Sequence, residues 1–355
     1  MKTQSEYKLN KDEYDLIGNC IEGSKVFLVC GNSARASTLT DYISKRFETF
    51  IFSEFTSNPK YEEVINGSKK FKGFNPDTLI AVGGGSAIDV AKCILVFDED
   101  RIIHESDFSL KELKPVKKFI AVPTTAGTGS EATRFAVIYR NGEKTSVESE
   151  YCLPDDVFFI SSMLDTLGEY QRKCTMLDAF SHAIESWWCV NATDESREYA
   201  LKAIKLFFEA KDDYLNNVTS GNSVMLEASN YAGKAINITK TTAAHAMAYK
   251  LTTLFGYAHG HAVGLCLKSL WKYHLEKGLQ TLVDLAEELE YESAESMYED
   301  YVKIFNELQL EHPNIRDAQL IQLVNTVNVD RLKNNPISLD KNSIDGLYRE
   351  ISMKY

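Results

Sequence analysis

The first half of the chain alternates short apolar runs with segments of helical periodicity. The runs are hydrophobic at nearly every position rather than at every second one, which is typical of strands buried on both faces of a parallel sheet. We expect strands at 25–30, 49–52, 78–82 and 118–122, with helices at 37–47, 61–71 and 86–96. This alternation predicts an α/β domain whose ligands bind at the carboxyl ends of the strands.

The pattern changes near residue 165, where strand signals end and long amphipathic segments begin. This spacing of apolar residues predicts a helical domain. The expected helices cover 177–190, 195–215, 223–237, 241–253, 262–275, 279–289, 293–308 and 317–327. We place the boundary between Pro154 and Tyr170 and assign 1–163 to the α/β domain and 164–355 to the helical domain.

The composition is that of a globular protein: of 355 residues, 44% are hydrophobic and 25% are charged. A net charge of −12 argues against nucleic acid or an anionic membrane as a partner. The seven cysteines are scattered without a CxxC motif, which favours reduced thiols over a disulfide framework. The polar segment 1–15 lacks the apolar core of a signal peptide, and no apolar run reaches membrane-spanning length. We therefore expect a cytoplasmic protein.

Four residues of the second half have spacings that suit a metal site. Asp178 and His182 are four residues apart, which puts both side chains on one face of a helix. His245 and His259 are 14 residues apart. Over this length, a helix followed by a turn can fold the chain back on itself. Three imidazoles and one carboxylate suit Fe²⁺ or Zn²⁺ better than Ca²⁺ or Mg²⁺. The alternative for Asp178 and His182 is a hydrogen-bonded pair on a helix face.

A glycine-rich turn follows the expected strand 78–82 and opens a helix. Its residues are Gly83, Gly84, Gly85 and Ser86, with Asp89 one turn later. Consecutive glycines let the backbone approach a phosphate, and the helix N-terminus favours an anion. The local alternative, which is compatible with phosphate binding, is a helix capped by Ser86 and Asp89 in a capping-box arrangement.

A second turn of small and hydroxyl residues follows the strand 118–122. It supplies Thr124, Thr125, Thr128 and Ser130, beside which a ribose or nicotinamide could pack. Two such turns at adjacent strand ends favour a dinucleotide over a mononucleotide, although this turn by itself could be only a loop. The chain lacks both GxGxxG and a P-loop, which argues against kinases and ATPases.

These motifs, in this order, resemble those of the iron-dependent (group III) alcohol dehydrogenase family. The resemblance covers about residues 20–275 and rests on Asn58-Pro59 and on segments 83–92, 123–131, 178–185, 245–249 and 259–261. It implies a Rossmann-like N-terminal domain that binds a nucleotide, an all-α C-terminal domain that binds a metal, and a cleft between them. This is the dehydroquinate synthase-like architecture.

The resemblance also implies roles for individual residues. The implied metal ligands are Asp178, His182, His245 and His259. The implied contacts to NAD or NADP are Gly31, Asn58, Gly83, Gly84, Gly85, Ser86, Asp89, Thr124, Thr125, Thr128, Ser130 and Lys144. We expect a homodimer that acts on a small aldehyde or alcohol.

Within the family, the chain is most similar to the phosphonoacetaldehyde reductases, also called hydroxyethylphosphonate dehydrogenases. The similarity rests on segments 149–154, 232–245 and 259–263 and on the short length of the chain. It implies reduction of phosphonoacetaldehyde to 2-hydroxyethylphosphonate.

Two departures from the family pattern bear on function. Many members have a histidine four residues after the third ligand, where it is thought to relay protons, but here the position is Tyr249. A phenol is a poorer base near neutrality, so His261 is the alternative relay; its other interpretation is a hydrogen-bonded imidazole at a helix start. Gly31 stands where NAD-preferring relatives often carry Asp, and Asn32, Ser33 and Arg35 follow it. Without that carboxylate, the site should admit NADP(H).

The implied reaction is hydride transfer between a nicotinamide and an aldehyde carbon, with the metal as a Lewis acid on the carbonyl oxygen. Lys240, five residues before His245, and Arg134 are the candidate partners for an anionic substrate group; otherwise both are solvated surface charges. One alternative is a generalist alcohol dehydrogenase or a maleylacetate reductase-like enzyme. An alternative of another class is a dehydroquinate synthase-like lyase that uses a metal and NAD.

Overall fold

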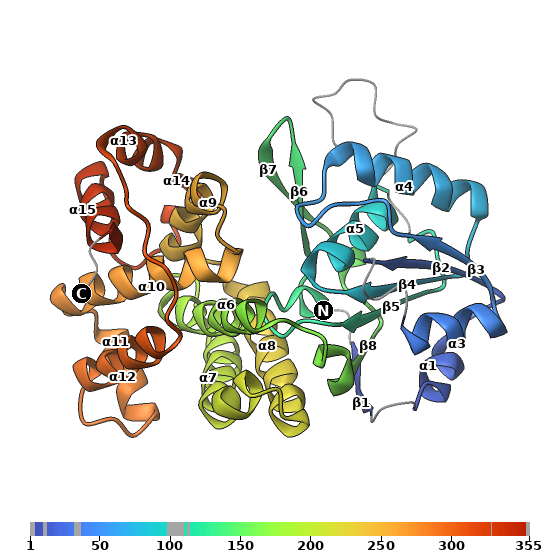
Figure 1. Ribbon diagram of the computed structural model, residues 1–355, viewed down its shortest axis with the longest axis horizontal. Helices are drawn as coiled ribbons and strands as arrows, with labels where there is room; N and C mark the ends of the chain where they lie inside the picture. Colours follow the sequence, from blue (N-terminus) through green and yellow to red (C-terminus); the bar gives the residue numbers. More distant parts are fainter. Residues whose placement is uncertain are drawn as a thin grey trace. The chain divides into compact units, whose positions relative to one another are not determined.

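Six parallel strands form one sheet in the N-terminal part of the chain (Figure 1). The structure is a computed structural model that describes residues 4–9, 13–31, 37–97, 110–111, 114–327 and 329–352. Within these residues the sheet has the order β1-β8-β5-β4-β2-β3. The strands are β1 (Ser5–Leu9), β2 (Lys25–Cys30), β3 (Glu48–Phe52), β4 (Thr78–Gly83), β5 (Lys118–Pro123) and β8 (Asp156–Ile160).

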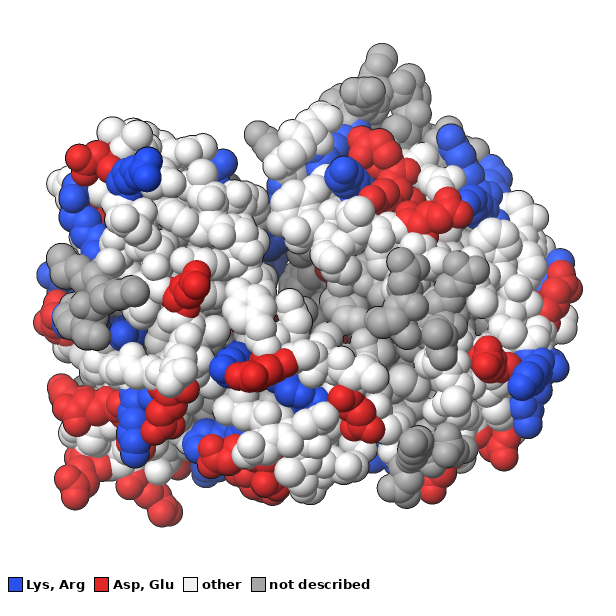
Figure 2. All heavy atoms as spheres, in the orientation of Figure 1, with Lys and Arg blue, Asp and Glu red and all other residues white. Residues whose placement is uncertain are grey.

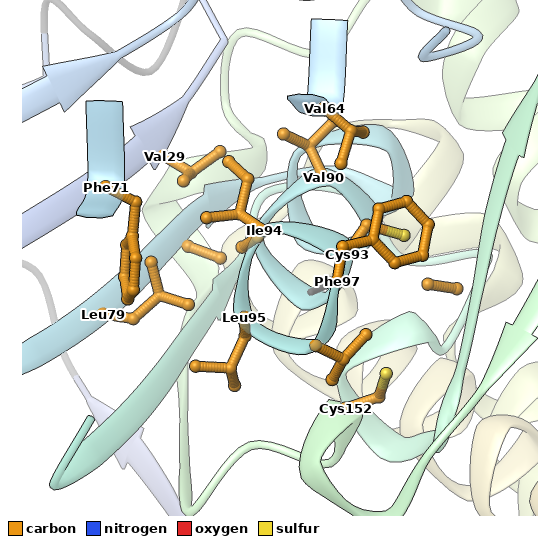
Figure 3. Packing of buried hydrophobic residues seen from close by; sticks show 14 of the residues in the cluster. Val29, Val64, Phe71, Leu79, Val90, Cys93, Ile94, Leu95, Phe97 and Cys152 are labelled. Carbon is orange, nitrogen blue, oxygen red and sulfur yellow. The ribbon is translucent and has the colours of Figure 1, made fainter. Parts of the chain in front are cut away.

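Different helices cover the two faces of this sheet. The helices are α1 (Asp15–Cys20), α3 (Thr38–Arg46), α4 (Tyr61–Phe74) and α5 (Gly85–Val96). Alternate residues of a strand point to opposite faces, so Phe27 and Val29 pack in the same core as α4 and α5. Val26 and Leu28 pack on the other face, in the same core as α1 and α3. Figure 3 shows the first of these cores, with Val29 lying near α5.

The strand order creates a switch point between β2 and β4. Helix α3 leads from β2 to β3 on one face, whereas α5 leads from β4 to β5 on the other. Because β2 and β4 are neighbours, the chain leaves their carboxyl ends in opposite directions. Open α/β sheets bind their ligands at such points. The α/β class predicted from the sequence is confirmed, and its four expected strands agree with the structure within a few residues.

Several elements of this part were not predicted. The strands β1 and β8 pair with each other, and a hairpin is formed by β6 (Phe135–Arg140) and β7 (Glu143–Glu148). The short 3₁₀ helices are η2 (Ser130–Ala132), η3 (Glu150–Cys152) and η4 (Ser161–Leu164). Most of β1 is polar because it is an exposed edge strand, so it carries little hydrophobic signal.

The rest of the chain is helical. The chain divides into two compact units, 1–166 and 167–355, and the predicted boundary at 163/164 lies a few residues earlier. The helices of the second unit are α6 (Glu169–Trp188), α7 (Asp194–Leu215), α8 (Thr219–Thr239), α9 (Ala243–Phe255), α10 (His259–Glu276), α11 (Gln280–Glu288), α12 (Ala294–Glu307), α13 (Asp317–Thr326), α14 (Val329–Leu332) and α15 (Lys341–Ser352). Helix α10 contacts α6, α9, α12 and α15 (Figure 1).

Two sequence-based boundaries in this unit are wrong in a way that matters for the site. Helix α6 begins at Glu169 rather than at 177. The sequence pattern missed its first turns because they are polar and carry no apolar stripe. Helix α10 begins at His259 rather than at 262, so this histidine occupies the first helical turn. Helix α15 was not predicted.

Charged side chains of both signs lie on the face of the molecule shown in Figure 2. On the face shown in Figure 2, the described Lys and Arg side chains lie among Asp and Glu side chains and form no continuous basic surface. Acidic side chains gather at the α11–α12 end of the helical unit (Figures 1 and 2). Among the described residues, no helix combines the length and the apolarity that a membrane crossing needs. All seven cysteines are free.

Candidate metal centre and nucleotide-binding loops

The four predicted metal ligands come together in the second unit. Helix α6 supplies Asp178 and His182, while α9 and α10 supply His245 and His259 near their N-termini. The Nε2 atoms of the three histidines lie around a single oxygen, Oδ1 of Asp178. The distances are 4.0 Å for His182, 3.4 Å for His245 and 3.9 Å for His259.

This geometry fits a first-row divalent ion. Ligand atoms about 2.1 Å from a tetrahedral ion lie roughly 3.4 Å from one another, close to the shortest of these distances. The ligand atoms of Asp178, His245 and His259 all lie within 4.8 Å of one another, whereas His182 is not part of this group and joins the site through its 4.0 Å distance to Asp178. Among the described residues, the buried atoms Oδ1 of Asp178 and Nε2 of His245 have no hydrogen-bond partner. Buried polar atoms are rarely left unpaired, so a bound cation explains both.

The alternative, a hydrogen-bonded Asp–His pair on one helix face, fits less well. Nε2 of His182 is 4.0 Å from Oδ1 of Asp178, which is too far for a hydrogen bond. Burial works to raise the pKa of Asp178, but the neighbouring imidazoles outweigh burial and lower the pKa. The carboxylate is therefore ionised near neutrality, as a metal ligand must be.

A fifth buried group, Glu185, contacts this centre, and sequence reasoning did not single it out. One carboxylate oxygen of Glu185 meets Nδ1 of His245, the ring nitrogen that faces away from Asp178. The other oxygen accepts hydrogen bonds at the start of α9. The available signal was an acidic residue within the apolar segment Ala183–Trp188 of a helix.

Close packing of α10 on α6 sets the position of His259. A Cβ added at Gly260 would lie 1.9 Å from the carbonyl oxygen of Cys174, one turn before Asp178 on α6. Only glycine allows the two backbones to approach so closely. The contact therefore determines how near His259 comes to Asp178.

His261 also takes part in this helix contact. Its Nε2 faces the carbonyl oxygen of Glu311 at 2.8 Å and must donate, because a carbonyl only accepts. Its Nδ1 then accepts from the hydroxyl of Tyr170 at 3.0 Å, and the Tyr170 oxygen accepts from the backbone N–H of Ala258. Burial lowers the pKa of His261 to about 4. Both nitrogens are occupied, which favours the interpretation as a hydrogen-bonded imidazole at a helix start over a proton relay.

The remaining catalytic candidates have distinct positions. Tyr249 follows His245 by one turn of α9, on the same face of that helix. Lys240 is exposed and ends α8, with a backbone φ of 63° and ψ of −179°. This conformation is strained for any residue except glycine. Arg134 lies in the first unit, where its Nε is 2.9 Å from Glu148, an ion pair at the base of the β6–β7 hairpin.

The two glycine-rich turns of the first unit lie against each other. They follow the neighbouring strands β4 and β5, and the backbone N–H of Thr124 donates to Gly83. A Cβ added at Gly84 would lie 3.1 Å from the side chain of Thr125. One at Gly85 would lie 2.8 Å from the side chain of Thr128. Glycines at 84 and 85 therefore allow the second turn to pack onto the N-terminus of α5.

The start of α5 differs from the capping box expected as a local alternative. The helix begins at Gly85 with Gly84 as its N-cap and no side-chain cap, so that prediction is wrong. Ser86 Oγ instead donates to the carbonyl of Ser57, which ties the loop after β3, next to Asn58, to this turn. Three strand ends are thus joined where the nucleotide was predicted to bind.

A buried cluster of hydrogen bonds around Lys92 and Asp89 holds the second turn in place. The ammonium of Lys92 donates to the carbonyl oxygens of Ser130, Thr133 and Phe135 at 2.6, 2.8 and 2.7 Å. Asp89 accepts from the hydroxyl of Ser130 at 2.6 Å. The side chains of Asp89 and Ser130, both predicted cofactor contacts, are thus bonded to each other. This arrangement favours a supporting role for them, and the sequence analysis did not assign one to Lys92.

Two predicted cofactor contacts lie at the edges of this region. Gly31 follows β2 at the switch point, and an added Cβ there would meet nothing within 4 Å. Lys144 lies in the hairpin strand β7, paired in register with Tyr139. Asn32, Ser33 and Arg35, on which the prediction for NADP(H) also rests, lie outside the described residues.

Comparison with known proteins agrees with these features. The model of the iron-containing alcohol dehydrogenase family matches residues 5–160, and the model of the C-terminal domain of the Fe-containing alcohol dehydrogenase family matches residues 173–352. A phosphonoacetaldehyde reductase from Streptomyces viridochromogenes is 29% identical over 251 residues, which are 67% of this chain and 63% of that protein. An aldehyde-alcohol dehydrogenase from Streptococcus pneumoniae is 28% identical over 327 residues, which are 86% of this chain and 37% of that protein. The chain thus spans less than two thirds of either relative.

Solved structures share the fold of the whole chain. The sulfoacetaldehyde reductase of Bifidobacterium kashiwanohense, solved in complex with NAD⁺, superposes with a TM-score of 0.89 at 22% identity. The match covers 99% of this chain and 98% of that one. At this identity the similarity shows a common fold, with a parallel-sheet domain followed by a helical domain.

Proposed function

Because the chain belongs to the iron-containing alcohol dehydrogenase family, we propose that it is a metal-dependent, nicotinamide-linked reductase of a small aldehyde. One observation carries the proposal: three imidazole nitrogens lie within 4.0 Å of the buried Oδ1 of Asp178. A set of three nitrogens and one oxygen suits Fe²⁺ or Zn²⁺.

The residues of the two units have different roles. When bound, the divalent ion supplies Lewis acidity toward a carbonyl oxygen, and NADH or NADPH supplies the hydride. Asp178, His182, His245 and His259 hold the ion. The N-terminus of α5 and the backbone of the two glycine-rich turns hold the nucleotide phosphates, since N–H groups at a helix start favour anions.

We propose Tyr249 as the residue that delivers the proton to the product oxygen. It lies one helical turn from His245, whereas both nitrogens of His261 are already hydrogen-bonded. A phenol carries a hydroxyl proton that it can donate. Replacing Tyr249 by Phe should lower kcat while leaving metal content unchanged, as measured by turnover and metal analysis.

The proposed substrate is phosphonoacetaldehyde, reduced to 2-hydroxyethylphosphonate by one hydride and one proton. Two observations support it: the similarity to a phosphonoacetaldehyde reductase, and the strained Lys240 in the segment that leads into α9. Strain of this kind persists only where the surrounding structure imposes it, and it clusters at active sites and ligand-binding sites. Arg134 supports the proposal less, because Glu148 already pairs with it.

The alternatives differ from this proposal in ways that can be measured. A generalist alcohol dehydrogenase or a maleylacetate reductase-like enzyme would not favour the phosphonate. A dehydroquinate synthase-like lyase would use NAD without net oxidation of the nucleotide. Since no carboxylate stands at Gly31, we propose that NADPH is accepted at least as readily as NADH.

The test is a substrate panel followed by nicotinamide absorbance. Enzyme loaded with Fe²⁺ or Zn²⁺ is given NADH or NADPH and either phosphonoacetaldehyde, sulfoacetaldehyde, acetaldehyde or propionaldehyde. We expect the highest kcat/KM for the phosphonate, since a charge-assisted hydrogen bond contributes about 1.5–3 kcal/mol, or roughly ten- to a hundred-fold. Equal efficiency on charged and neutral aldehydes would reject the phosphonate.

Two variants locate the group that recognises the anion. Changing Lys240 to Met should lower kcat/KM for the phosphonate by roughly ten-fold or more and spare propionaldehyde. The matched control is Lys234→Met, six residues earlier on α8, where the ammonium lies 4.7 Å from the ring centre of Tyr231. An equal effect of both variants would remove Lys240 from the substrate site and leave the metal-dependent reductase intact.

A further inference from the structure

Glu185 is a carboxylate with no exposure to solvent, in the C-terminal turn of α6. An ionised group is removed from water only where other groups compensate for its hydration. Within the part of the chain that the structure describes, the hydrogen-bond donors to Glu185 all lie at the start of α9. Oε1 accepts from the backbone N–H and hydroxyl of Thr242 at 3.1 and 2.6 Å, and from the N–H of Ala244 at 2.9 Å.

These bonds make Glu185 the cap of a helix to which it does not belong. The N-cap residue of α9, Thr242, makes no side-chain cap of its own. The first N–H groups of a helix have no partner within it, and a negative charge at that end is favoured by the helix dipole. Glu185 satisfies these groups from α6, and its carboxylate is thereby held in one orientation.

The second oxygen, Oε2, meets Nδ1 of His245. A carboxylate only accepts hydrogen bonds, so Nδ1 carries the hydrogen, and in the neutral imidazole Nε2 keeps its lone pair. That lone pair faces Asp178 Oδ1 at 3.4 Å, within the candidate metal centre. The side-chain contact thus selects the form of His245 that can bind a metal.

We propose that Glu185 is the positioning residue of the metal centre. It fixes both the orientation and the tautomer of His245 and thereby sets the affinity of the centre for its divalent ion. This inference rests on the metal centre of the proposed function. Carboxylates that accept from a metal-bound histidine also raise its basicity, which strengthens the metal–nitrogen bond.

The decisive variant is Glu185→Gln, which keeps the size of the side chain and removes its charge. The amide oxygen must face the N–H groups of α9, because an amide NH₂ in that place would put two hydrogen-bond donors in contact. The amide NH₂ then faces Nδ1 of His245, which must become the acceptor. The hydrogen moves to Nε2, the lone pair needed by the metal is lost, and the cap of α9 remains.

The matched control is Thr242→Val, which removes the hydroxyl that donates to Oε1 and leaves the contact of Oε2 with His245. It loosens the same helix start without changing the tautomer. Glu185→Asp, which keeps the charge on a shorter side chain, is the conservative variant that should partly restore metal binding.

Two measurements test the proposal. Competition with a chelator gives the Zn²⁺ affinity of each variant, and we expect Glu185→Gln to lose at least ten- to a hundred-fold and Thr242→Val to stay within about three-fold. Nitrogen NMR of the metal-free protein labelled in histidine, with His245→Gln for assignment, should show hydrogen on Nδ1 of His245 in the unmodified protein and on Nε2 in Glu185→Gln.

The outcomes separate this proposal from the function on which it rests. Equal Zn²⁺ affinity in Glu185→Gln and the unmodified protein, or an unchanged tautomer, overturns the role of Glu185. Equal losses in Glu185→Gln and Thr242→Val also overturn it, because general loosening of α9 would then suffice. Absence of Zn²⁺ binding in the unmodified protein rejects the metal centre itself, while the NMR measurement still decides whether Glu185 sets the tautomer.

Discussion

Replacing Gly260 by Ala tests whether helix packing sets the geometry of the metal centre. The new Cβ would lie 1.9 Å from the carbonyl oxygen of Cys174 and 3.0 Å from Cβ of Asp178. Real Cβ atoms essentially never approach closer than 3.0 Å, so α10 and α6 must separate by about 1.1 Å. The obstacle is backbone rather than the end of a flexible side chain, so no rotamer change relieves it.

The consequence for the ligands can be estimated from the same displacement. His259 Nε2 is 3.9 Å from Asp178 Oδ1, and moving α10 away widens this distance to roughly 5 Å. Two ligand atoms bound about 2.1 Å from one ion can be at most about 4.2 Å apart. His259 can then no longer share an ion with Asp178, and we expect at least a ten-fold loss of Zn²⁺ affinity.

The assay is titration of the metal-free protein with Zn²⁺ or Co²⁺, together with denaturant unfolding. Overpacking costs about 1–3 kcal/mol, offset by up to about 1 kcal/mol because Ala favours helix more than Gly does. The matched control is Gly346→Ala in α15, where an added Cβ meets nothing within 4 Å. It should raise stability slightly and leave metal affinity unchanged. Wild-type affinity in Gly260→Ala would refute the claim that this contact places His259.

Three further outcomes are expected. In denaturant titrations, the free energy of unfolding of Lys240→Gly should be about 1 kcal/mol higher than that of Lys240→Ala, because only glycine relieves the backbone strain at φ 63°. Equal stabilities of the two variants would show that there is no strain. Burial lowers the pKa of His274 to about 3, so the unfolded chain takes up the proton first and stability falls as pH drops below 6.5. Between pH 7 and 5, denaturant titrations should show the unmodified protein losing about 2 kcal/mol more than His274→Leu, and equal losses would contradict this pKa. Lys92→Met should weaken NADPH binding in calorimetry but not Zn²⁺ binding, since Lys92 holds the turn at Ser130; unchanged NADPH affinity would contradict its supporting role.

The sequence predicted the buried strands well and the exposed ones poorly. Strand β4 is buried at every position, so its hydrophobic run is unmistakable. Strand β1 buries only Leu9, and its partner β8 lies about 150 residues away, so neither local pattern nor local pairing revealed it. The β6–β7 hairpin did carry a signal that was overlooked. Asn141 and Gly142 form its two-residue loop with φ values of 52° and 77°, and Asn-Gly is the strongest short-range hairpin sequence.

The candidate site was predictable in its chemistry but not in its supports. The four ligand types and the i, i+4 spacing of Asp178 and His182 are visible in the sequence, and the structure brings all four together. The partners of Glu185 and the role of Gly260 depend on which helices touch, and periodicity does not contain that information. The same holds for Lys92, whose burial follows from the turn that folds over it.

A single helix, α6, organises the candidate metal centre. It supplies Asp178 and His182, it holds the start of α9 through Glu185, and it holds the start of α10 through the close contact at Gly260. The other two ligands each lie within three residues of such a contact, so their positions follow from the helix crossings rather than from loops. Sites built on helices keep their geometry better than sites on loops. The proposed metal ligands and the residues that support them all lie in the second unit, whereas the predicted nucleotide contacts lie in the first. Metal affinity should therefore respond to changes at α6, α9 and α10 and remain insensitive to changes in the glycine-rich turns.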